Sequence, residues 1–195
     1  MHTQEMALLT YDALLLPGGR LEIRILDPIT LSMVADVLKG KYPLAFGMRN
    51  SVAMPPSFPI ATRCELIDFN QLEDDSLSIT LEGKQRVKVL SAKQEKDGRW
   101  LAEVMDCPNW AEEPIRGEFT LISAALEQFY EVNPDLRGLY SSEVHLDDAA
   151  WVSQRWLEVL PLYNKDKQLL LNQPDCHKTM DFVLKLIKSH VQQQL

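Results

Sequence analysis

The sequence lacks the glycine-rich motifs on which many phosphate-binding and nucleophile-bearing turns depend. It has only eight glycines in 195 residues. The nearest match to GxxxxGK[ST] is Gly83-Lys84-Gln85, which has Ser78 in place of the first glycine and no hydroxyl residue after the lysine. GxGxxG and GxSxG do not occur either. These absences argue against a P-loop ATPase, a dinucleotide-dependent enzyme and an α/β-hydrolase.

Local metal-binding and thiol motifs are also missing. The three cysteines and four histidines form no CxxC or HExxH pattern. Cys176-His177 is an adjacent pair at a predicted helix start, where a thiol pKa can be lowered, but a capping-turn cysteine is the favoured interpretation. Asp74-Asp75 is interpreted as a turn and Asp147-Asp148 as a helix cap. The sequence therefore predicts no catalytic, cofactor-binding or metal site, and no enzyme activity.

The chain also lacks an excess of basic residues and any long apolar run. Its formal net charge is −8, from 20 basic and 28 acidic residues, which disfavours nucleic acid and anionic membranes as partners. The longest apolar runs are far too short to span a bilayer, and no signal peptide is recognisable. An odd number of distant cysteines is typical of reduced thiols, so we expect a cytoplasmic protein. The oligomeric state stays open.

The residues that are present predict an α+β protein in two parts, with the change near Pro114. Residues 1–113 are dominated by alternating apolar and polar positions, which indicate a small, strongly curved antiparallel sheet or barrel. One helix is expected within it, from an Asp27-Pro28 start to a Gly40 stop. Residues 114–195 carry apolar stripes at helical spacing and predict a helical bundle.

Within the first part, the pattern predicts several short strands. The opening pair is expected at 11–16 and 21–26, around a Pro17-Gly18-Gly19 turn. Further strands are expected at 43–48, 60–72, 77–82, 86–94 and 99–105, with a bend or bulge at Gly83. Residues 50–59 hold three prolines without a period and are expected to form a loop.

Several segments together resemble the N-terminal region of Lon proteases. The LLPGG turn at 15–19 leading to Asp27-Pro28 is similar to the family's opening, and IATRCEL at 60–66 is similar to its "GT-x-A-x-I" strand, although Ala61 replaces the usual glycine. LSITLEGKQRVKV at 77–89 resembles the strand–"EG-x-x-R"–strand signature. LPLYNKDKQLLLNQPD at 160–175 resembles the helical part. The likeness covers roughly residues 7–188.

This resemblance implies a PUA-like β-barrel at 1–113 followed by a helical bundle at 114–195. It also implies a stand-alone substrate-recognition module without ATPase or peptidase domains, which binds other polypeptides and catalyses nothing. The implied partners are unfolded or hydrophobic polypeptides and a AAA+ protease, with an adaptor role in protein quality control. The signature residues are interpreted as structural, with Arg86 expected to pair with a barrel carboxylate; they are Pro17, Gly18, Glu82, Gly83 and Arg86.

The apolar loop gives the candidate peptide-binding residues. Met48, Val52, Met54 and Phe58 could meet hydrophobic partners, because methionine adapts to varied surfaces and exposed apolar groups mark interaction sites. The alternative is that these residues cover one end of the barrel.

An alternative function is RNA binding, because PUA-like barrels can bind RNA. Lys84, Arg86 and Lys88 would share one strand face, with Lys93 and Arg99 nearby. A solvated strand face would look the same.

Overall fold

The structure is a computed structural model that describes residues 2–74, 76–140 and 144–193. It divides into two compact units, Met1–Asn109 and Trp110–Leu195. The division thus falls slightly before the boundary expected from the sequence. The Trp110 indole donates to the carbonyl oxygen of Gln173 (2.9 Å), and the Glu113 backbone amide donates to Asp148 (2.9 Å), so this segment is bonded to the helical unit.

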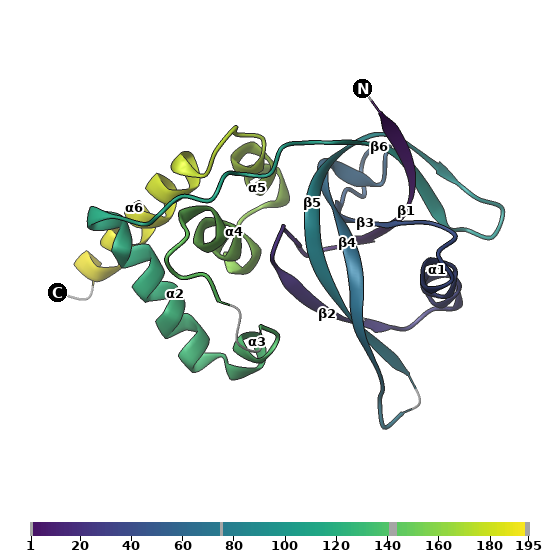
Figure 1. Cartoon of the computed structure of the whole chain (residues 1–195), viewed down its shortest axis with the longest axis horizontal. Coiled ribbons are helices and arrows are strands. Elements are labelled where there is room, and N and C mark those ends of the chain that lie inside the picture. The colour runs from purple at the N-terminus through teal and green to yellow at the C-terminus, as the bar shows by residue number, and fades with distance from the viewer. Residues whose placement is uncertain (1, 75, 141–143, 194–195) are drawn as a thin grey trace. The chain divides into compact units, whose positions relative to one another are not determined.

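In its described residues the first unit contains six strands and one helix, which are labelled in Figure 1. The elements are β1 (Thr3–Tyr11), β2 (Arg20–Ile25), α1 (Pro28–Leu38), β3 (Leu44–Arg49), β4 (Ser57–Gln71), β5 (Leu77–Gln94) and β6 (Trp100–Asp106). Asp27 caps α1 by accepting from the Thr30 amide (2.8 Å), and Gly40 follows the helix with a φ of 72°. The predicted helix and its two end signals are therefore confirmed.

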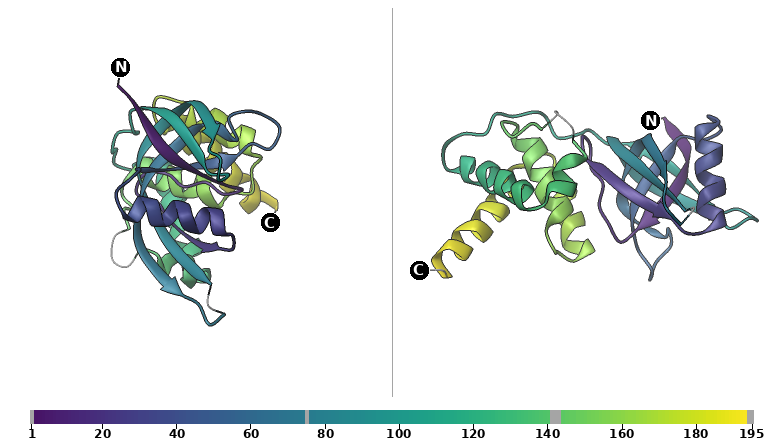
Figure 2. Two further views of the ribbon diagram at one scale, coloured as in Figure 1. Left: turned by 90° about the vertical axis from the view of Figure 1, so that its right-hand side faces the viewer. Right: turned by 90° about the horizontal axis from the view of Figure 1, so that it is seen from below.

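The strands close into a ring, which confirms the predicted barrel. The sheet order is β2-β5-β4-β3-β1-β6, and an additional β5–β6 pairing joins the two ends of the β5-β4-β3-β1-β6 series. The barrel is not purely antiparallel, however, because β1 runs parallel to β3. The distal part of the β4–β5 hairpin extends beyond the ring as an arm (Figures 1 and 2).

The first strand does not lie where the sequence pattern placed it. β1 ends at Tyr11, whereas the run Leu14–Leu16 is buried without being a strand. Met6 to Leu9 are all buried, because alternate residues of β1 enter two different apolar clusters on opposite faces. A strand buried on both faces is apolar throughout and shows no alternation.

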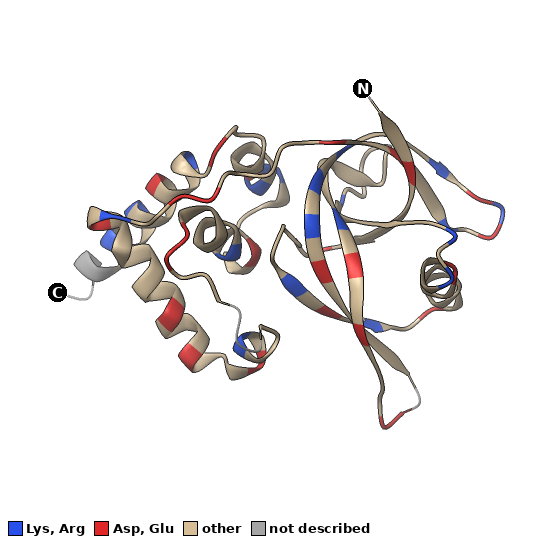
Figure 3. Ribbon diagram, in the orientation of Figure 1, with Lys and Arg blue, Asp and Glu red and all other residues tan. Residues whose placement is uncertain are grey.

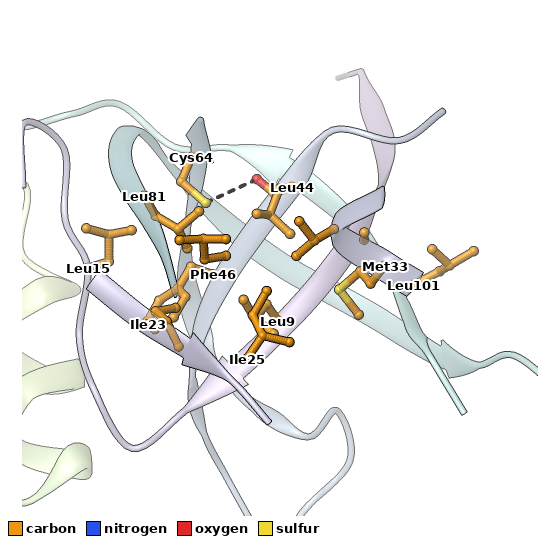
Figure 4. Close-up of a cluster of buried hydrophobic side chains, with 13 residues drawn as sticks. Leu9, Leu15, Ile23, Ile25, Met33, Leu44, Phe46, Cys64, Leu81 and Leu101 are labelled. Carbon is orange, nitrogen blue, oxygen red and sulfur yellow. Dashed lines mark hydrogen bonds between the residues drawn. The ribbon is translucent and has the colours of Figure 1, made fainter. Parts of the chain in front are cut away.

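The larger cluster joins the ring strands to β2 and α1 (Figure 4). Met33 and Val34 of α1 contribute to it, as do Ile23 and Ile25 of β2. Its buried members are Ala7, Leu9, Leu15, Ile23, Ile25, Met33, Val34, Leu44, Phe46, Cys64, Ile79, Leu81 and Leu101. The smaller cluster takes residues from all five ring strands: Met6, Leu8, Ala45, Ala61, Val87, Val89, Ala102 and Val104. The ring strands therefore pack against buried apolar side chains on both of their faces.

The second unit is helical, as predicted. Its elements are the 3₁₀ turn η1 (Gly117–Phe119), α2 (Thr120–Val132), α3 (Pro134–Gly138), α4 (Ala149–Val159), α5 (Asn164–Leu171) and α6 (His177–Gln193). The short α3 was not predicted. Asp148 caps α4 by accepting from the amides of Ala150 and Trp151, which confirms the predicted cap. Tyr163 is the N-cap of α5.

Candidate polypeptide-binding surface

The signature glycine lies where two backbones touch. A Cβ on Gly83 would stand 2.1 Å from the carbonyl oxygen of Leu16, a distance that no side chain can occupy. Gly18 donates to the Gly83 carbonyl (2.8 Å), and the Gly83 amide donates to Gly19 (2.9 Å). Gly18 has a φ of 72°, the left-handed region that glycine adopts without strain. Backbone hydrogen bonds thus join the turn at 16–19 to β5.

The charged signature residues anchor neighbouring segments. Glu82 pairs with Arg20 of β2 (2.8 Å) and with Lys84. Burial raises the pKa of Glu82, but hydrogen bonds from Lys84 and Arg20 outweigh it and lower that pKa overall. Arg86 is buried; its guanidinium donates to the Pro108 carbonyl (3.1 Å from Nε), and its amide donates to Asn109 (2.9 Å). The Glu82–Arg20 pair thus joins β5 to β2, and the Arg86 contacts join β5 to the segment after β6.

The predicted peptide-binding residues are not equally exposed. Val52 and Met54 are 92% and 68% exposed, at the tip of the loop between β3 and β4. Phe58, the second residue of β4, is half-buried. Met48 is only 1% exposed, so the expectation that it lies on this surface is corrected. Met48 lies in β3, whose residues from Leu44 to Met48 are all buried. The accessible apolar side chains lie at the tip of the loop instead.

The base of this loop is held in place. The Asn50 amide donates to the Pro56 carbonyl (2.8 Å), which closes the loop across its ends. Beneath it, a Cβ on Gly47 would lie 2.7 Å from the Cβ of Ser57, so the first residue of β4 packs directly on β3. Val52 and Met54 are therefore displayed on a closed loop with a fixed base.

Two further exposed apolar groups of this unit were missed by the sequence analysis. Ile67 and Phe69 of β4 are 41% and 61% exposed on the hairpin arm. On α1, Leu31 and Leu38 are seven residues apart, share one helix face, and are 45% and 57% exposed. The pairing register of β4 with β5 shifts near Ile67, and the sequence shows no change in alternation that would predict this shift. Helix α1 is apolar on more than one side, so its exposed apolar residues could not be distinguished from core residues in the sequence.

The basic residues of the RNA alternative do not form one open basic face. Arg86 is buried, whereas Lys84 on the same strand pairs with Glu82 and Glu65. Lys93 pairs with Glu5 (2.9 Å). Arg99 likewise contacts two carboxylates, those of Asp36 and Asp97. Figure 3 shows acidic and basic residues interleaved along these strands, so this surface does not concentrate positive charge as a phosphate-binding face would.

Cys176 lies against Glu113 and His177 in the second unit. The ligand atoms of these three residues lie within 4.8 Å of one another. Burial, followed by the neighbouring Glu113 carboxylate, raises the pKa of the Cys176 thiol to about 11. This environment does not favour a thiolate nucleophile. Among the helices that the structure describes, none is long and apolar enough to cross a membrane.

Comparison with known proteins finds similarity along nearly the whole chain. The family profile described as the ATP-dependent protease La (LON) substrate-binding domain matches residues 5–189. A Lon N-terminal domain protein from Xanthomonas campestris has a similar structure, with a TM-score of 0.72 and 24% identity over 93% of this chain and 98% of that chain. The N-terminal domain of the Mycobacterium avium complex Lon protease has a TM-score of 0.66 and 15% identity, over 96% and 100%. These structures share the fold. Curated protein sequences give no match.

Proposed function

Because the chain belongs to the family of Lon substrate-binding domains, we propose that it binds unfolded or hydrophobic polypeptides through the loop that displays Val52 and Met54. The observation that carries this proposal is the exposure of two neighbouring large apolar side chains on a loop whose base is fixed. Exposed apolar groups gain free energy when a partner covers them, and a fixed base reduces the ordering cost of binding.

The composition of the loop suits varied partners. Met54 is unbranched and adapts to differently shaped apolar surfaces, and Phe58 adds a half-buried aromatic ring beside the loop. A Lys or Arg is not required for such contacts, so an acidic protein can make them. The partner class is therefore set by exposed apolar segments rather than by charge.

We further propose that the bound polypeptide is presented to a AAA+ protease, so that the chain acts as an adaptor in protein quality control. The 195 residues given contain no P-loop and no GxSxG nucleophile motif, and the proposal assigns ATP hydrolysis and peptide-bond cleavage to a separate protease. Purification of native complexes from cell extract tests this step: enrichment of a AAA+ protease supports the adaptor role, and its consistent absence argues against it.

Polypeptide binding is tested with a permanently unfolded, carboxymethylated protein that carries a fluorescent label. We expect its anisotropy to rise on titration with the wild-type chain. Val52→Asp/Met54→Asp should weaken binding roughly tenfold to hundredfold, because two apolar contacts are replaced by charges that lose hydration on contact.

A matched control separates the site from a general charge effect. Val132→Asp/Leu169→Asp introduces the same two charges at aliphatic residues of α2 and α5 that are 76% and 66% exposed. This control should bind like wild type. No binding by the wild-type chain would exclude the function, whereas equal binding by both double variants would exclude only the loop.

A further inference from the structure

Three different metal-binding side chains converge in the helical unit, although they are far apart in sequence. A carboxylate oxygen of Glu113 lies 2.8 Å from Nε2 of His177, and the other lies 3.0 Å from it. The Cys176 thiol completes a group whose ligand atoms are all within 4.8 Å of one another. Within the described ranges, this is the only group of three or more His, Cys, Asp or Glu ligands found so close together.

The backbone fixes both segments that supply these side chains. The Glu113 amide donates to the Asp148 carboxylate (2.9 Å), and its carbonyl accepts from the Ala149 amide (2.7 Å), so the start of α4 holds it. On the other side, the His177 amide donates to Asp175 (3.0 Å), and the Cys176 carbonyl accepts from Met180 in the first turn of α6 (2.9 Å). The candidate metal ligands therefore come from the start of α6 and from an extended segment that is hydrogen-bonded to the start of α4.

A fourth residue orients the imidazole. Nδ1 of His177 lies 3.4 Å from a carboxylate oxygen of Asp175, while Nε2 faces Glu113. Histidines that bind metals commonly give their second ring nitrogen to a carboxylate, which fixes the tautomer and the ring orientation. Of the two ring nitrogens of His177, Nε2 thus faces the candidate ligand Glu113, and Nδ1 faces the supporting carboxylate of Asp175.

We propose that Glu113, Cys176 and His177 bind a Zn²⁺ ion. One sulfur, one imidazole nitrogen and one carboxylate oxygen are a donor set that zinc accepts, whereas Ca²⁺ and Mg²⁺ prefer oxygen ligands alone. In a tetrahedral zinc site the ligand atoms are roughly 3.3–3.7 Å apart, as bond lengths of about 2.0–2.3 Å require. The ligand atoms of Glu113, Cys176 and His177, all within 4.8 Å of one another, lie close to this spacing. Three protein ligands leave a fourth position for water.

The side chains differ in exposure in a way that fits an ion arriving from solvent. Cys176 is 1% exposed, with its sulfur 3.6 Å from that of Met180, while the side chains of His177 and Glu113 are about half-exposed. The thiol would form the inner wall of the site and the other two ligands its mouth. A coordinating thiol loses its proton to solvent when the metal binds, so a neutral thiol in the free protein does not prevent coordination.

Titration of the chelator-treated full chain with Zn²⁺, followed by calorimetry, tests the proposal. We expect saturable one-to-one binding. Titration with Co²⁺ should produce a near-ultraviolet thiolate-to-metal charge-transfer band, which reports the sulfur ligand directly. His177→Gln, a change at an exposed residue that should leave the fold intact, is expected to weaken Zn²⁺ binding at least about tenfold. Cys176→Ser should abolish the cobalt band.

Two control variants complete the experiment. Cys107→Ser removes a half-buried thiol of the other unit, and Glu112→Gln removes the carboxylate next to Glu113 in sequence. Both should bind Zn²⁺ like wild type and keep the cobalt band. Absence of saturable Zn²⁺ binding by the wild-type chain would overturn the proposal, as would unchanged affinity in the folded His177→Gln variant. Loss of polypeptide binding alone would not affect it, because the zinc site involves only residues of the helical unit.

Discussion

The barrel and the helical unit each bury an arginine, and they satisfy it in different ways. In the barrel, Arg86 donates to the Pro108 carbonyl, and the buried Thr62 hydroxyl likewise donates to backbone, the Leu15 carbonyl (2.6 Å). In the helical unit, Arg155 pairs with the Glu158 carboxylate (2.8 Å) and lies over the Trp151 ring. The barrel contact therefore depends on the position of the backbone, and the helical contact on a compensating charge.

The candidate sites of the two units use different groups, although both units expose large apolar side chains, Val132 and Leu169 of the helical unit among them. In the barrel, Val52 and Met54 lie together on one loop. In the helical unit, Glu113 from the segment before η1 meets His177 at the start of α6. The two proposals therefore assign apolar polypeptides to the barrel and an ion to the helical unit.

The largest expected effect of a single substitution is at the backbone contact of the barrel. Gly83→Ala places a methyl group 2.1 Å from the Leu16 carbonyl oxygen, so the turn at 16–19 must separate from β5. Both backbone hydrogen bonds between them would be lost. We expect the free energy of unfolding to fall by at least about 4 kcal/mol. Denaturant titration, with hydrogen exchange resolved by segment, measures this loss and locates it in the barrel.

The matched substitution in the helical unit is Gly138→Ala at the end of α3. A Cβ there meets nothing within 4 Å, and its φ lies outside the left-handed range. We expect no loss, or a gain of up to about 1 kcal/mol from the reduced entropy of the unfolded chain. Similar losses for the two variants would contradict the view that backbone contact specifically limits the barrel.

The next largest effect is expected at the buried ion pair of the helical unit. Glu158→Gln keeps the size of the side chain but removes the carboxylate charge that pairs with the Arg155 guanidinium, whose side chain is 0% exposed. Removing one member of a buried pair costs about 3–5 kcal/mol. We expect a loss in this range, measured by denaturant titration and confined to the helical unit in hydrogen exchange.

The same chemical change in the barrel provides the comparison. Glu82→Gln removes the partner of Arg20 at a contact whose side chains keep 17% and 18% of their exposure. Water still reaches both groups, so we expect a loss of only about 1 kcal/mol. If Glu82→Gln were as costly as Glu158→Gln, charge balance would matter equally in both units and the distinction between them would fail.

The sequence predicted the elements whose signals are local. Asp27-Pro28 and Gly40 bounded α1 correctly, and Asp148 was correctly placed as a cap. Helix caps can be read this way because donor and acceptor are within about three residues of each other. The bulge predicted at Gly83 is also present, since the register of β4 and β5 shifts between Arg63 and Cys64 opposite it.

The prediction from the sequence failed where a strand is buried on both faces, because such a strand shows no alternation of apolar and polar residues. Residues 6–9 form a strand buried on both faces, whereas Leu14–Leu16 had the composition of a strand but pack as a turn segment against β5. Parallel pairing of β1 with β3 was also invisible, because strand direction depends on connections between distant segments. Only the folded backbone decides these points.

The candidate sites show the same limit. Val52 and Met54 were identified because a proline-rich segment without a period indicates a loop, but Met48 at its border could not be separated from them without coordinates. The Cys176-His177 pair was visible in the sequence as a single feature. Its convergence with Glu113 was not, because 64 residues separate Glu113 from His177. Spacing rules detect metal sites only when the ligands are close in sequence.

The last comparison concerns the two aspartate caps, one in each unit. Asp148→Ala should cost about 2 kcal/mol, because this carboxylate accepts from the amides of Ala150 and Trp151 and also from Glu113, which crosses from another segment. Asp27→Ala should cost about 1 kcal/mol, because Asp27 accepts from the amide and hydroxyl of Thr30 within its own helix turn. Thermal unfolding of both variants against wild type measures the difference.

The pH dependence of the Asp27 cap sharpens this last comparison. Hydrogen bonds from the hydroxyl and then the amide of Thr30 lower the pKa of Asp27 below its ordinary value of 3.8. A lowered pKa means that the ionised cap stabilises the fold fully above pH 3.8, and that this contribution is lost as the pH falls through the folded-state pKa. The difference between wild type and Asp27→Ala should therefore shrink in acid. A constant difference from pH 7 to pH 2 would show that the alanine acts through packing or helix propensity, and that α1 does not depend on this charge.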